Sequence, residues 1–335
     1  MIKVGVIGIG SMGTTHLDVY GKRDDVRILA VSDLIADKRE GVGKTKGNIE
    51  GQAKGGLDFA SFRKYAEGME LIADPEVELV DICLPTPLHH PYAVAALRAG
   101  KHVLVEKPFC RTAAEADDLV AEAAKAKGML MCALCMRFWP AWEWLKQTID
   151  QGTYGKVFAA SFRRLATAPG RSFYVDGNQA GGAALDLHIH DADFVQYCFG
   201  LPKAVFSRGY CKDTSATDHI LTQYLYDDIP LVSAEGGWSM RPPFGFWMRY
   251  VVNFERATAV FDIGAKPALR VMIDGKVEEP ALAEGMGYQY EIAYFLDCIR
   301  SGRRPERNTP AHAANAVRLI EAEVESIRTG QIVRL

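Results

Sequence analysis

Two short segments of the sequence place ionisable side chains where a catalytic group would be expected. Glu106 and Lys107 follow the apolar run Val103–Val105, so charge comes directly after a predicted buried strand, where it is costly to desolvate. Asp186 and His190 lie four residues apart in a segment with a helical apolar stripe, which puts both side chains on one helix face. An ammonium can stabilise a developing alkoxide, and an imidazole with an ordinary pKa of roughly 6.5 can take up a proton. Lys107 and His190 therefore suit the oxidation of an alcohol.

Structural explanations compete with this catalytic interpretation. Lys107 could be a strand-end lysine whose alkyl stem is buried and whose ammonium reaches water. Asp186 and His190 could form a structural pair on the helix surface. Together with His188 and Asp191 they also resemble metal ligands. On a helix, however, His188 points about 160° away from Asp186 around the axis. We therefore expect no metal site.

A glycine pattern near the N-terminus predicts a dinucleotide site. Gly8, Gly10 and Gly13 form G-x-G-x-x-G directly after a predicted strand and before a predicted helix. The first glycine permits a tight turn, the second lets the backbone approach a pyrophosphate, and the third allows close helix–strand packing. Ser11 and Met12 begin the helix, whose N–H groups and dipole favour phosphate.

Asp33 indicates which dinucleotide the site prefers. It ends the second predicted strand, 20 residues after Gly13, where a carboxylate can hold the ribose hydroxyls of an adenosine. A carboxylate would repel a 2′-phosphate, and the next residue, Leu34, is not basic. NAD is therefore favoured over NADP, although Lys38 and Arg39 keep NADP open.

The elements that must position these residues divide the chain into two parts. Strand and helix patterns alternate over residues 1–128, which predicts a doubly wound parallel sheet, the Rossmann architecture. Aromatic segments of period two dominate residues 129–335, which predicts an α+β domain with a large, mostly antiparallel sheet. The fold class is thus α/β, with a first domain for the cofactor and a second, α+β domain.

Composition excludes several classes of protein. The chain has 335 residues with 39 basic and 42 acidic side chains, a net charge of −3, which gives no electrostatic case for a nucleic-acid or membrane partner. No apolar run reaches the roughly 20 residues that span a bilayer. The seven cysteines lie mostly in apolar runs, and Cys132 and Cys135 fit core packing better than a metal or redox site. We expect a cytoplasmic protein with reduced thiols.

Several motifs together resemble one known family. The segments GIGSMGTTH, LPTPLHH, VLVEKPF, MRFWP and GGAALDLHIHDADFV occur in the order and spacing typical of the Gfo/Idh/MocA oxidoreductases. The resemblance covers essentially the whole chain. It implies an N-terminal Rossmann domain, a C-terminal domain with an open sheet, and a homodimer or homotetramer formed through that sheet. It also implies a nicotinamide cofactor and a sugar, inositol or related polyol as substrate.

The resemblance also implies roles for individual residues. The Lys, Asp and His trio of the family corresponds to Lys107, Asp186 and His190. We expect Lys107 to polarise the reacting oxygen, His190 to act as base or acid, and Asp186 to orient it or bind substrate. The cofactor set implied is Gly8, Gly10, Ser11, Met12, Gly13, Asp33, Leu84, Thr86, His89, Glu106 and Lys107.

One departure from the family pattern lies in the cofactor set. The family has T-P-N at the end of the strand that precedes the cofactor, and this chain has Leu84, Pro85 and Thr86. The Thr86 hydroxyl lacks the two-sided hydrogen bonding of an amide. A contact of Thr86 with the cofactor ribose would therefore be weaker than that of the usual asparagine.

Candidate substrate contacts come from polar side chains near these motifs: Arg137, Arg163, Tyr174 and His188. Arg163 is followed by Arg164, and in an alternating strand only one of the two can face the cleft. Three functions are consistent with the whole pattern. The favoured one is an NAD-dependent dehydrogenase of sugars or cyclitols. The alternatives are an NAD-assisted glycoside hydrolase, which oxidises transiently and then eliminates, and a non-catalytic NAD(P)-binding regulator.

Overall fold

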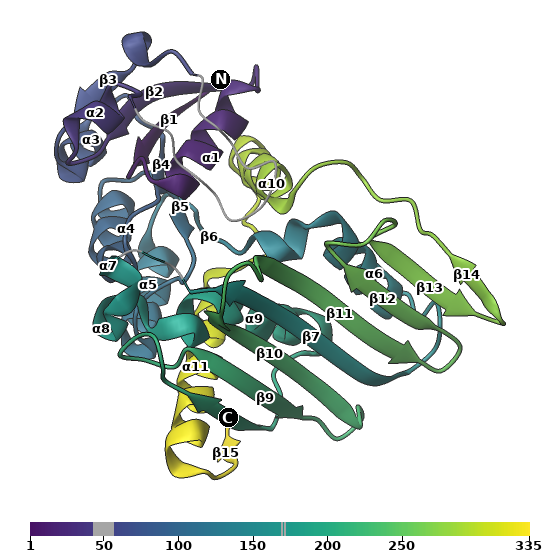
Figure 1. Ribbon diagram of the computed structural model, residues 1–335. Coiled ribbons are helices and arrows are strands. Elements are labelled where there is room, and N and C mark those ends of the chain that lie inside the picture. Colours follow the sequence, from purple (N-terminus) through teal and green to yellow (C-terminus); the bar gives the residue numbers. More distant parts are fainter. Residues whose placement is uncertain (43–56, 169, 171) are drawn as a thin grey trace. The chain divides into compact units, whose positions relative to one another are not determined.

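The computed structural model describes residues 1–42, 57–168, 170 and 172–335, which form two compact units (Figure 1). The first unit comprises residues 1–135 and 286–314, and the second comprises residues 136–285 and 315–335. No helix of the described residues is long and apolar enough to cross a membrane. The seven cysteines, all of them described, are free thiols, and both Cys132 and Cys135 are buried.

The first unit has a parallel sheet, with six strands among the described residues in the order β3-β2-β1-β4-β5-β6. Every neighbouring pair is parallel. The Rossmann topology predicted from the alternating pattern is confirmed. The strands are β1 (Ile2–Ile7), β2 (Val26–Ser32), β3 (Arg63–Tyr65), β4 (Leu79–Ile82), β5 (His102–Glu106) and β6 (Leu130–Ala133).

Helices cover both faces of this sheet. Val103, Leu104 and Val105 of β5 are all fully buried, although successive side chains of a strand point to opposite faces. Leu104 belongs to the core cluster formed with α1 and α10, whereas α4 packs against β5 and α5. The helices are α1 (Ser11–Gly21), α2 (Ala36–Arg39), α3 (Gly68–Ala73), α4 (His89–Arg98), α5 (Ala113–Lys125) and α10 (Gly287–Ser301), with short 3-10 turns η1 (Phe59–Ser61) and η2 (Thr86–Leu88).

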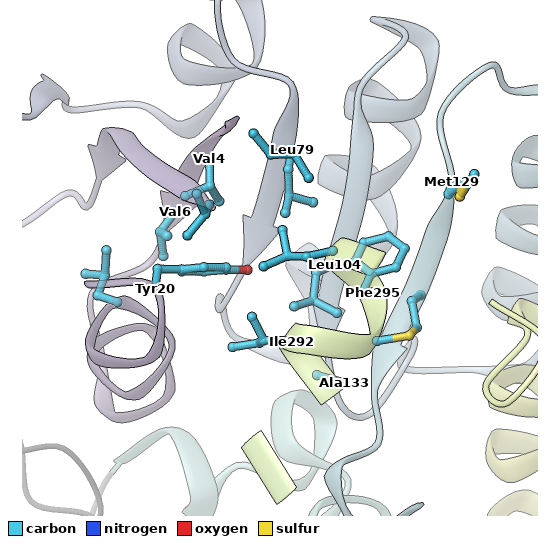
Figure 2. Close-up of a cluster of buried hydrophobic side chains, with 14 of the residues drawn as sticks. Val4, Val6, Tyr20, Leu79, Leu104, Met129, Ala133, Ile292 and Phe295 are labelled. Atoms are coloured by element: carbon cyan, nitrogen blue, oxygen red, sulfur yellow. The ribbon is translucent and has the colours of Figure 1, made fainter. Parts of the chain in front are cut away.

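The core beneath α1 and α10 joins segments from both ends of the sequence. Figure 2 shows Tyr20 reaching from α1 toward Leu104, with Ile292 and Phe295 of α10 in the same cluster. The first unit consequently extends past the expected boundary at residue 128. It includes β6, which pairs with β5, and it includes α10, which packs on α1.

The second unit is built on a mixed sheet, with nine strands in the described part of the chain in the order β14-β13-β12-β11-β7-β10-β9-β8-β15. Only β7 and β10 are parallel neighbours in it, so the predicted mostly antiparallel sheet is confirmed. The strands are β7 (Val157–Thr167), β8 (Ala204–Tyr210), β9 (His219–Leu225), β10 (Leu231–Met240), β11 (Phe246–Phe254), β12 (Thr258–Asp262), β13 (Leu269–Ile273), β14 (Lys276–Glu278) and β15 (Val333–Arg334).

One face of the mixed sheet carries the core of the second unit. Trp142 lies at the centre of an aromatic cluster that also holds Phe162, Phe194, Tyr250 and Phe261. The helical segments of the unit and its borders are η3 (Cys135–Phe138), α6 (Pro140–Asp150), α7 (Ser172–Val175), α8 (Gly177–Ala180), the π-helical segment η4 (Ala184–His188), α9 (Ile189–Phe199) and α11 (Pro310–Thr329).

Candidate active site

The glycine turn after β1 has the shape of a pyrophosphate cradle. Gly8 has a φ of +91°, and a Cβ on it would lie 2.5 Å from the carbonyl oxygen of Cys83. A Cβ on Gly13 would lie 1.9 Å from the carbonyl oxygen of Gly8. Around Gly10, by contrast, no described atom lies within 4 Å of the Cβ position. Two glycines thus close the turn, and the third leaves space beside the backbone.

The beginning of α1 adds donors to this space. Gly10 is the N-cap, no described side chain caps it, and no acidic residue occupies the first turn, where Ser11 and Met12 lie. The first N–H groups of a helix have no intrahelical acceptor and carry the positive end of the helix dipole. The open glycine and these donors fit the pyrophosphate of a dinucleotide.

Asp33 is held beside the same turn. Its Oδ2 accepts a hydrogen bond of 2.8 Å from the Ile9 N–H, and its Oδ1 accepts one of 2.9 Å from the Ile35 N–H. The Nζ of Lys38 lies 3.4 Å from Oδ2, and Arg39 donates to the carbonyl of Asp33. The carboxylate is therefore fixed next to the glycines, and the Lys38 ammonium approaches the same oxygen that accepts from Ile9.

His89 connects the loops that follow β4 and β5. Its Nδ1 is 2.7 Å from the carbonyl oxygen of Pro108, and its Nε2 is 2.7 Å from that of Leu84. Burial lowers the pKa of His89, although the two carbonyls act in the opposite direction. Both ring nitrogens face backbone carbonyls, so His89 joins the two loops. The cofactor contact expected of His89 stays a prediction. Thr86, in the same turn, is also buried.

Lys107 lies immediately beyond β5 and is half-buried. Its backbone N–H donates a 3.0 Å hydrogen bond to Oε2 of Glu106, the last residue of that strand. Because parallel sheets bind ligands at the carboxyl ends of their strands, this is the edge where a reacting group would be expected. Glu106 and Lys107 thus share this edge with the glycine turn after β1.

Asp186 and His190 of the second unit lie at a break in helix geometry. Asp186 belongs to the π-helical segment η4, and His190 to the first turn of α9. Both are partly exposed, whereas His188 between them is fully buried. Single π-turns inside helices are frequent at functional sites. The spacing argument for a shared face of Asp186 and His190 agrees with this difference in burial.

His188 does not fit the substrate contact predicted for it. Its Nε2 is 3.0 Å from Oε2 of Glu323 in α11, and neither side chain is exposed. A Cβ on Gly236 of β10 would come within 2.7 Å of the His188 ring, so the imidazole packs directly on the sheet. His188 therefore links η4 to α11 inside the second unit.

The two predicted substrate arginines are also engaged elsewhere. Arg137 is fully buried, and its Nε and Nη2 donate to the two carboxylate oxygens of Asp193 at 2.8 and 2.6 Å. Arg163 points to the open face of the mixed sheet, where it lies 2.5 Å from Glu235. Arg164, on the alternate face, is buried against Asp191 of α9. The placement of both arginines argues against the predicted substrate contacts, because one is buried and the other faces away from η4.

Tyr174 remains close to the candidate helix. Its ring lies edge-on to the Trp238 ring, with the two ring centroids 5.8 Å apart. Leu187, the neighbour of Asp186, packs in the same hydrophobic cluster as Trp238. Trp238 was not predicted from the sequence. The available signal was a tryptophan directly after the glycine pair Gly236 and Gly237, near the end of a strand. The sequence interpretation also missed His16, Asp81 and Glu291, which form a buried cluster in the first unit.

Comparison with known proteins identifies the family. Residues 2–134 match the model of an oxidoreductase family with an NAD-binding Rossmann fold, GFO_IDH_MocA, and residues 142–260 match the GFO/IDH/MocA C-terminal domain. The chain belongs to the Gfo/Idh/MocA oxidoreductase family. Its first unit is accordingly an NAD(P)-binding Rossmann domain, and the family resemblance predicted from the motifs is confirmed.

Individual relatives carry dehydrogenase names. A myo-inositol 2-dehydrogenase of Thermotoga maritima is 32% identical over 59% of this chain, but the alignment spans only 55% of that protein. A trans-1,2-dihydrobenzene-1,2-diol dehydrogenase of Sus scrofa is 30% identical over 72% of this chain and 74% of its own length. A levoglucosan dehydrogenase in complex with NADH and L-sorbose has a TM-score of 0.85 at 20% identity, covering 99% of this chain and 98% of that one. At that identity the likeness concerns the fold.

Proposed function

We propose that the protein is an NAD-dependent dehydrogenase that oxidises a secondary hydroxyl of a sugar, sugar derivative or cyclitol, or reduces the corresponding ketone. The observation that carries the proposal is the position of Lys107 at the carboxyl edge of the parallel sheet, in the unit that holds the glycine turn. The names of the inositol and dihydrodiol relatives support a cyclic alcohol as the substrate class.

The residues of the first unit bind the cofactor and prepare the reacting oxygen. Gly8, Gly10 and the first turn of α1 hold the pyrophosphate, and Asp33 accepts from the ribose hydroxyls, which favours NAD over NADP. The nicotinamide, when bound, supplies the hydride acceptor. The Lys107 ammonium donates a hydrogen bond to the substrate oxygen and stabilises it as negative charge develops.

The second unit contributes the proton acceptor. His190 takes the hydroxyl proton during oxidation and returns it during reduction, which suits an imidazole near neutral pH. Asp186, one helical turn earlier, orients His190 or a substrate hydroxyl. Tyr174, packed against Trp238 near the same helix, offers its hydroxyl to the substrate.

The proposed self-association uses the open face of the mixed sheet. Leu221 and Val251 are 51% and 43% exposed there, on strands β9 and β11. The Arg163–Glu235 pair lies beside them on the same face, as strand pairing shows. Apolar side chains mixed with both signs of charge suit a self-complementary interface, so we propose a homodimer or homotetramer.

Light scattering after gel filtration tests that interface. The double variant Leu221→Glu/Val251→Glu should run at a lower mass than the wild type, because buried charge without a partner destabilises an interface. Met69→Glu, at an exposed apolar residue of α3 in the first unit, is the matched control and should leave the mass unchanged. A monomeric wild-type protein would rule out the interface.

A substrate panel tests the activity. Sugars, sugar acids, sugar phosphates and inositols are supplied with NAD, and NADH is followed by absorbance. The proposal requires net NADH formation with at least one compound, and formation slower by about a hundredfold or more with Lys107→Met. Cleavage of glycosides without net reduction of NAD would indicate the hydrolase instead. Tight NAD binding with no turnover of any compound would favour a regulator.

A further inference from the structure

A cluster of ionisable side chains is buried in the first unit beneath the loop that carries Lys107. It continues the core cluster of Figure 2 toward the carboxyl edge of the sheet. Leu79 and Leu104 face α1 and α10, and Asp81 and Glu106 are two residues further along the same strands. Because side chains of a strand repeat every two residues, both carboxylates point to that same side. The apolar layer thus ends in charge.

His16 of α1 lies between these two carboxylates. Its Nδ1 is 2.9 Å from Oδ2 of Asp81, in hydrogen-bond geometry. Its Nε2 is 3.3 Å from Oε1 of Glu106, at ion-pair distance though outside hydrogen-bond geometry. The imidazole and the Asp81 carboxylate are fully buried, and the Glu106 side chain is 7% exposed. Tyr20, one helical turn after His16, donates a 2.8 Å hydrogen bond to the same Asp81 oxygen.

The geometry sets the charge of the ring. An ionised carboxylate is an acceptor and a negative charge, so a ring with one carboxylate in hydrogen-bond geometry and a second at ion-pair distance is stabilised most with a proton on both nitrogens. Burial alone would lower the pKa of His16, but the charge of Asp81 and its hydrogen bond to the ring raise it well above the ordinary value. The ion pairs therefore stabilise the fold below the ordinary histidine pKa, and this contribution is lost as the pH rises through the raised pKa.

The remaining groups that face His16 are compatible with one positive charge. The Cys83 sulfur is 3.6 Å from Nδ1, and burial raises the pKa of this thiol, so it is neutral. Glu291 of α10 is fully buried, and burial also raises its pKa well above the ordinary value. Burial thus favours the uncharged form of Glu291, and the two carboxyl groups that lie within ion-pair distance of the His16 ring are those of Asp81 and Glu106.

Glu106 transmits this arrangement to the catalytic loop. One of its oxygens faces His16, and the other accepts the 3.0 Å hydrogen bond from the Lys107 backbone N–H. The Glu106 carboxylate is thus fixed from both sides, by a buried cation and by the first amide of the loop. If the cation were lost, the carboxylate would be free to rotate away from that amide.

We propose that His16, held as an imidazolium between Asp81 and Glu106, is a positioning residue that fixes the Lys107 loop for catalysis. The proposal rests on the catalytic role proposed for Lys107. His16 touches neither substrate nor cofactor in it and acts through Glu106. A variant that loses the link to Glu106 should lower kcat and leave the affinity for NAD nearly unchanged.

Paired substitutions separate positioning from general packing. His16→Asn places its amide nitrogen near Nδ1 and can donate only toward Asp81, whereas His16→Gln reaches toward Glu106. We expect kcat to fall about tenfold or more in His16→Asn, with KM for NAD within about threefold, and to recover partly in His16→Gln. Glu291→Gln, a neutral replacement for a neutral carboxyl, is the matched control and should keep wild-type kcat. Equal kcat in all four proteins, or equal loss in both His16 variants, would overturn the proposal.

Nuclear magnetic resonance of the wild-type protein decides the matter without turnover. The His16 ring should carry protons on both nitrogens at pH 7, above the ordinary histidine pKa of roughly 6.5, and the Lys107 amide signal should shift with the same midpoint when the ring loses a proton. A neutral His16 ring at pH 7, or an invariant Lys107 amide, would overturn the positioning role. Because this readout needs no substrate, its failure is distinguishable from failure of the proposed dehydrogenase activity.

A measurement of bound metal tests the alternative that these side chains form a metal site. His16, Asp81 and Cys83 bring ligand atoms within 4.8 Å of one another. The proposal expects no bound metal, because the hydrogen bonds from His16 and Tyr20 already engage Asp81. One equivalent of zinc in the purified protein that disappears in His16→Asn would overturn it.

Discussion

The two sheets of this protein differ in which of their surfaces are exposed to solvent. Strands β1, β4, β5 and β6 of the first unit are buried almost throughout their length, and the glycine turn, Asp33 and Lys107 lie at the carboxyl edge of their sheet. The mixed sheet of the second unit buries one face under α6, α9 and α11 and leaves the other open. The ionisable side chains of the second unit lie in three kinds of place: where η4 meets α9, in the buried interior, and on the open face of the sheet.

This difference explains where the sequence alone can place a polar residue in the fold. At the carboxyl edge of a parallel sheet, a polar residue at a strand end has few positions available, and its position follows from strand order. In the mixed sheet a polar residue can face the helices, the open side or the core. Arg163 and Arg164 illustrate the problem, since adjacent residues of β7 reach solvent and a buried aspartate respectively.

The largest effect on turnover is expected from a substitution of Lys107, at the carboxyl edge of the parallel sheet. Lys107→Ala should lower kcat by about a hundredfold or more, equivalent to about 2.7 kcal/mol, because the developing oxyanion loses its cation. NAD affinity, measured by fluorescence titration, should change little. The matched control is Lys125→Ala, an exposed lysine at the end of α5 whose removal should not affect turnover. An unchanged kcat in Lys107→Ala would contradict the proposed catalytic role of Lys107.

The second effect concerns the cofactor at the same edge. Asp33→Ala should weaken NAD binding by about tenfold or more, because the ribose hydroxyls lose a charged acceptor. Binding of NADP should weaken much less, since that carboxylate repels the 2′-phosphate. Calorimetric titration of both nucleotides measures the ratio, and Asp37→Ala, an exposed carboxylate of α2, is the control. Equal losses for the two nucleotides would contradict the NAD preference.

The third effect concerns a carboxylate that organises the second unit. Asp218 is fully buried and accepts hydrogen bonds from the N–H groups of residues 212–214, the Thr214 hydroxyl and the Trp238 indole. Burial alone would raise the pKa of Asp218, but these donors lower it. Its contribution to stability is therefore present above the ordinary pKa of about 3.9 and is lost as the pH falls through the lowered value.

We expect Asp218→Asn to lower the free energy of unfolding by about 1–3 kcal/mol at pH 7, because the amide leaves buried donors without acceptors. Urea unfolding followed by tryptophan fluorescence measures the loss at pH 7 and again toward pH 3, where it should shrink. Asp227→Asn, at an exposed ion pair with Lys203, should change stability by less than about 0.5 kcal/mol. A loss that does not depend on pH would contradict the ionised role of Asp218.

The smallest effect is expected at Tyr174. Tyr174→Phe keeps the ring contact with Trp238 and removes one hydroxyl, so KM for the substrate should rise only about threefold to tenfold while kcat stays within about twofold. Steady-state kinetics with the best compound of the panel measures both. The control is Tyr226→Phe, whose hydroxyl donates to the Gly200 carbonyl. An unchanged KM would remove Tyr174 from the substrate site.

Local signals allowed much of the first unit to be predicted. The glycine spacing fixed the turn before α1, and the capping box of Thr112 and Glu115 is present at the start of α5. In α11, most of which belongs to the second unit, the helix begins at Pro310 and ends at Thr329, next to Gly330, and these are residue types that ordinarily mark helix boundaries. In each case the determining residues are neighbours in sequence, so the chain carries the information locally.

The features that could not be predicted from the sequence depend on contacts between segments that are far apart in the chain. The pairing of Arg137 with Asp193 joins residues 56 positions apart, and nothing near Arg137 in sequence identifies its carboxylate. Likewise α10 returns to the first unit after strands β7 to β14 of the mixed sheet, and it packs on α1. His16 carried a readable signal, since it and Tyr20 share a helix face and Asp81 interrupts an apolar strand. That signal indicates a buried polar cluster without naming its partners.

The most direct test of the central claim follows one hydrogen atom. A substrate from the panel is deuterated at the carbon that bears the reacting hydroxyl and oxidised with NAD, and the mass of the reduced cofactor is measured. Direct hydride transfer predicts that the NADH formed is one mass unit heavier, at the C4 position of the nicotinamide, and that Lys107→Ala forms it about a hundredfold more slowly. Unlabelled NADH, or product formed without any reduced nucleotide, would contradict the account.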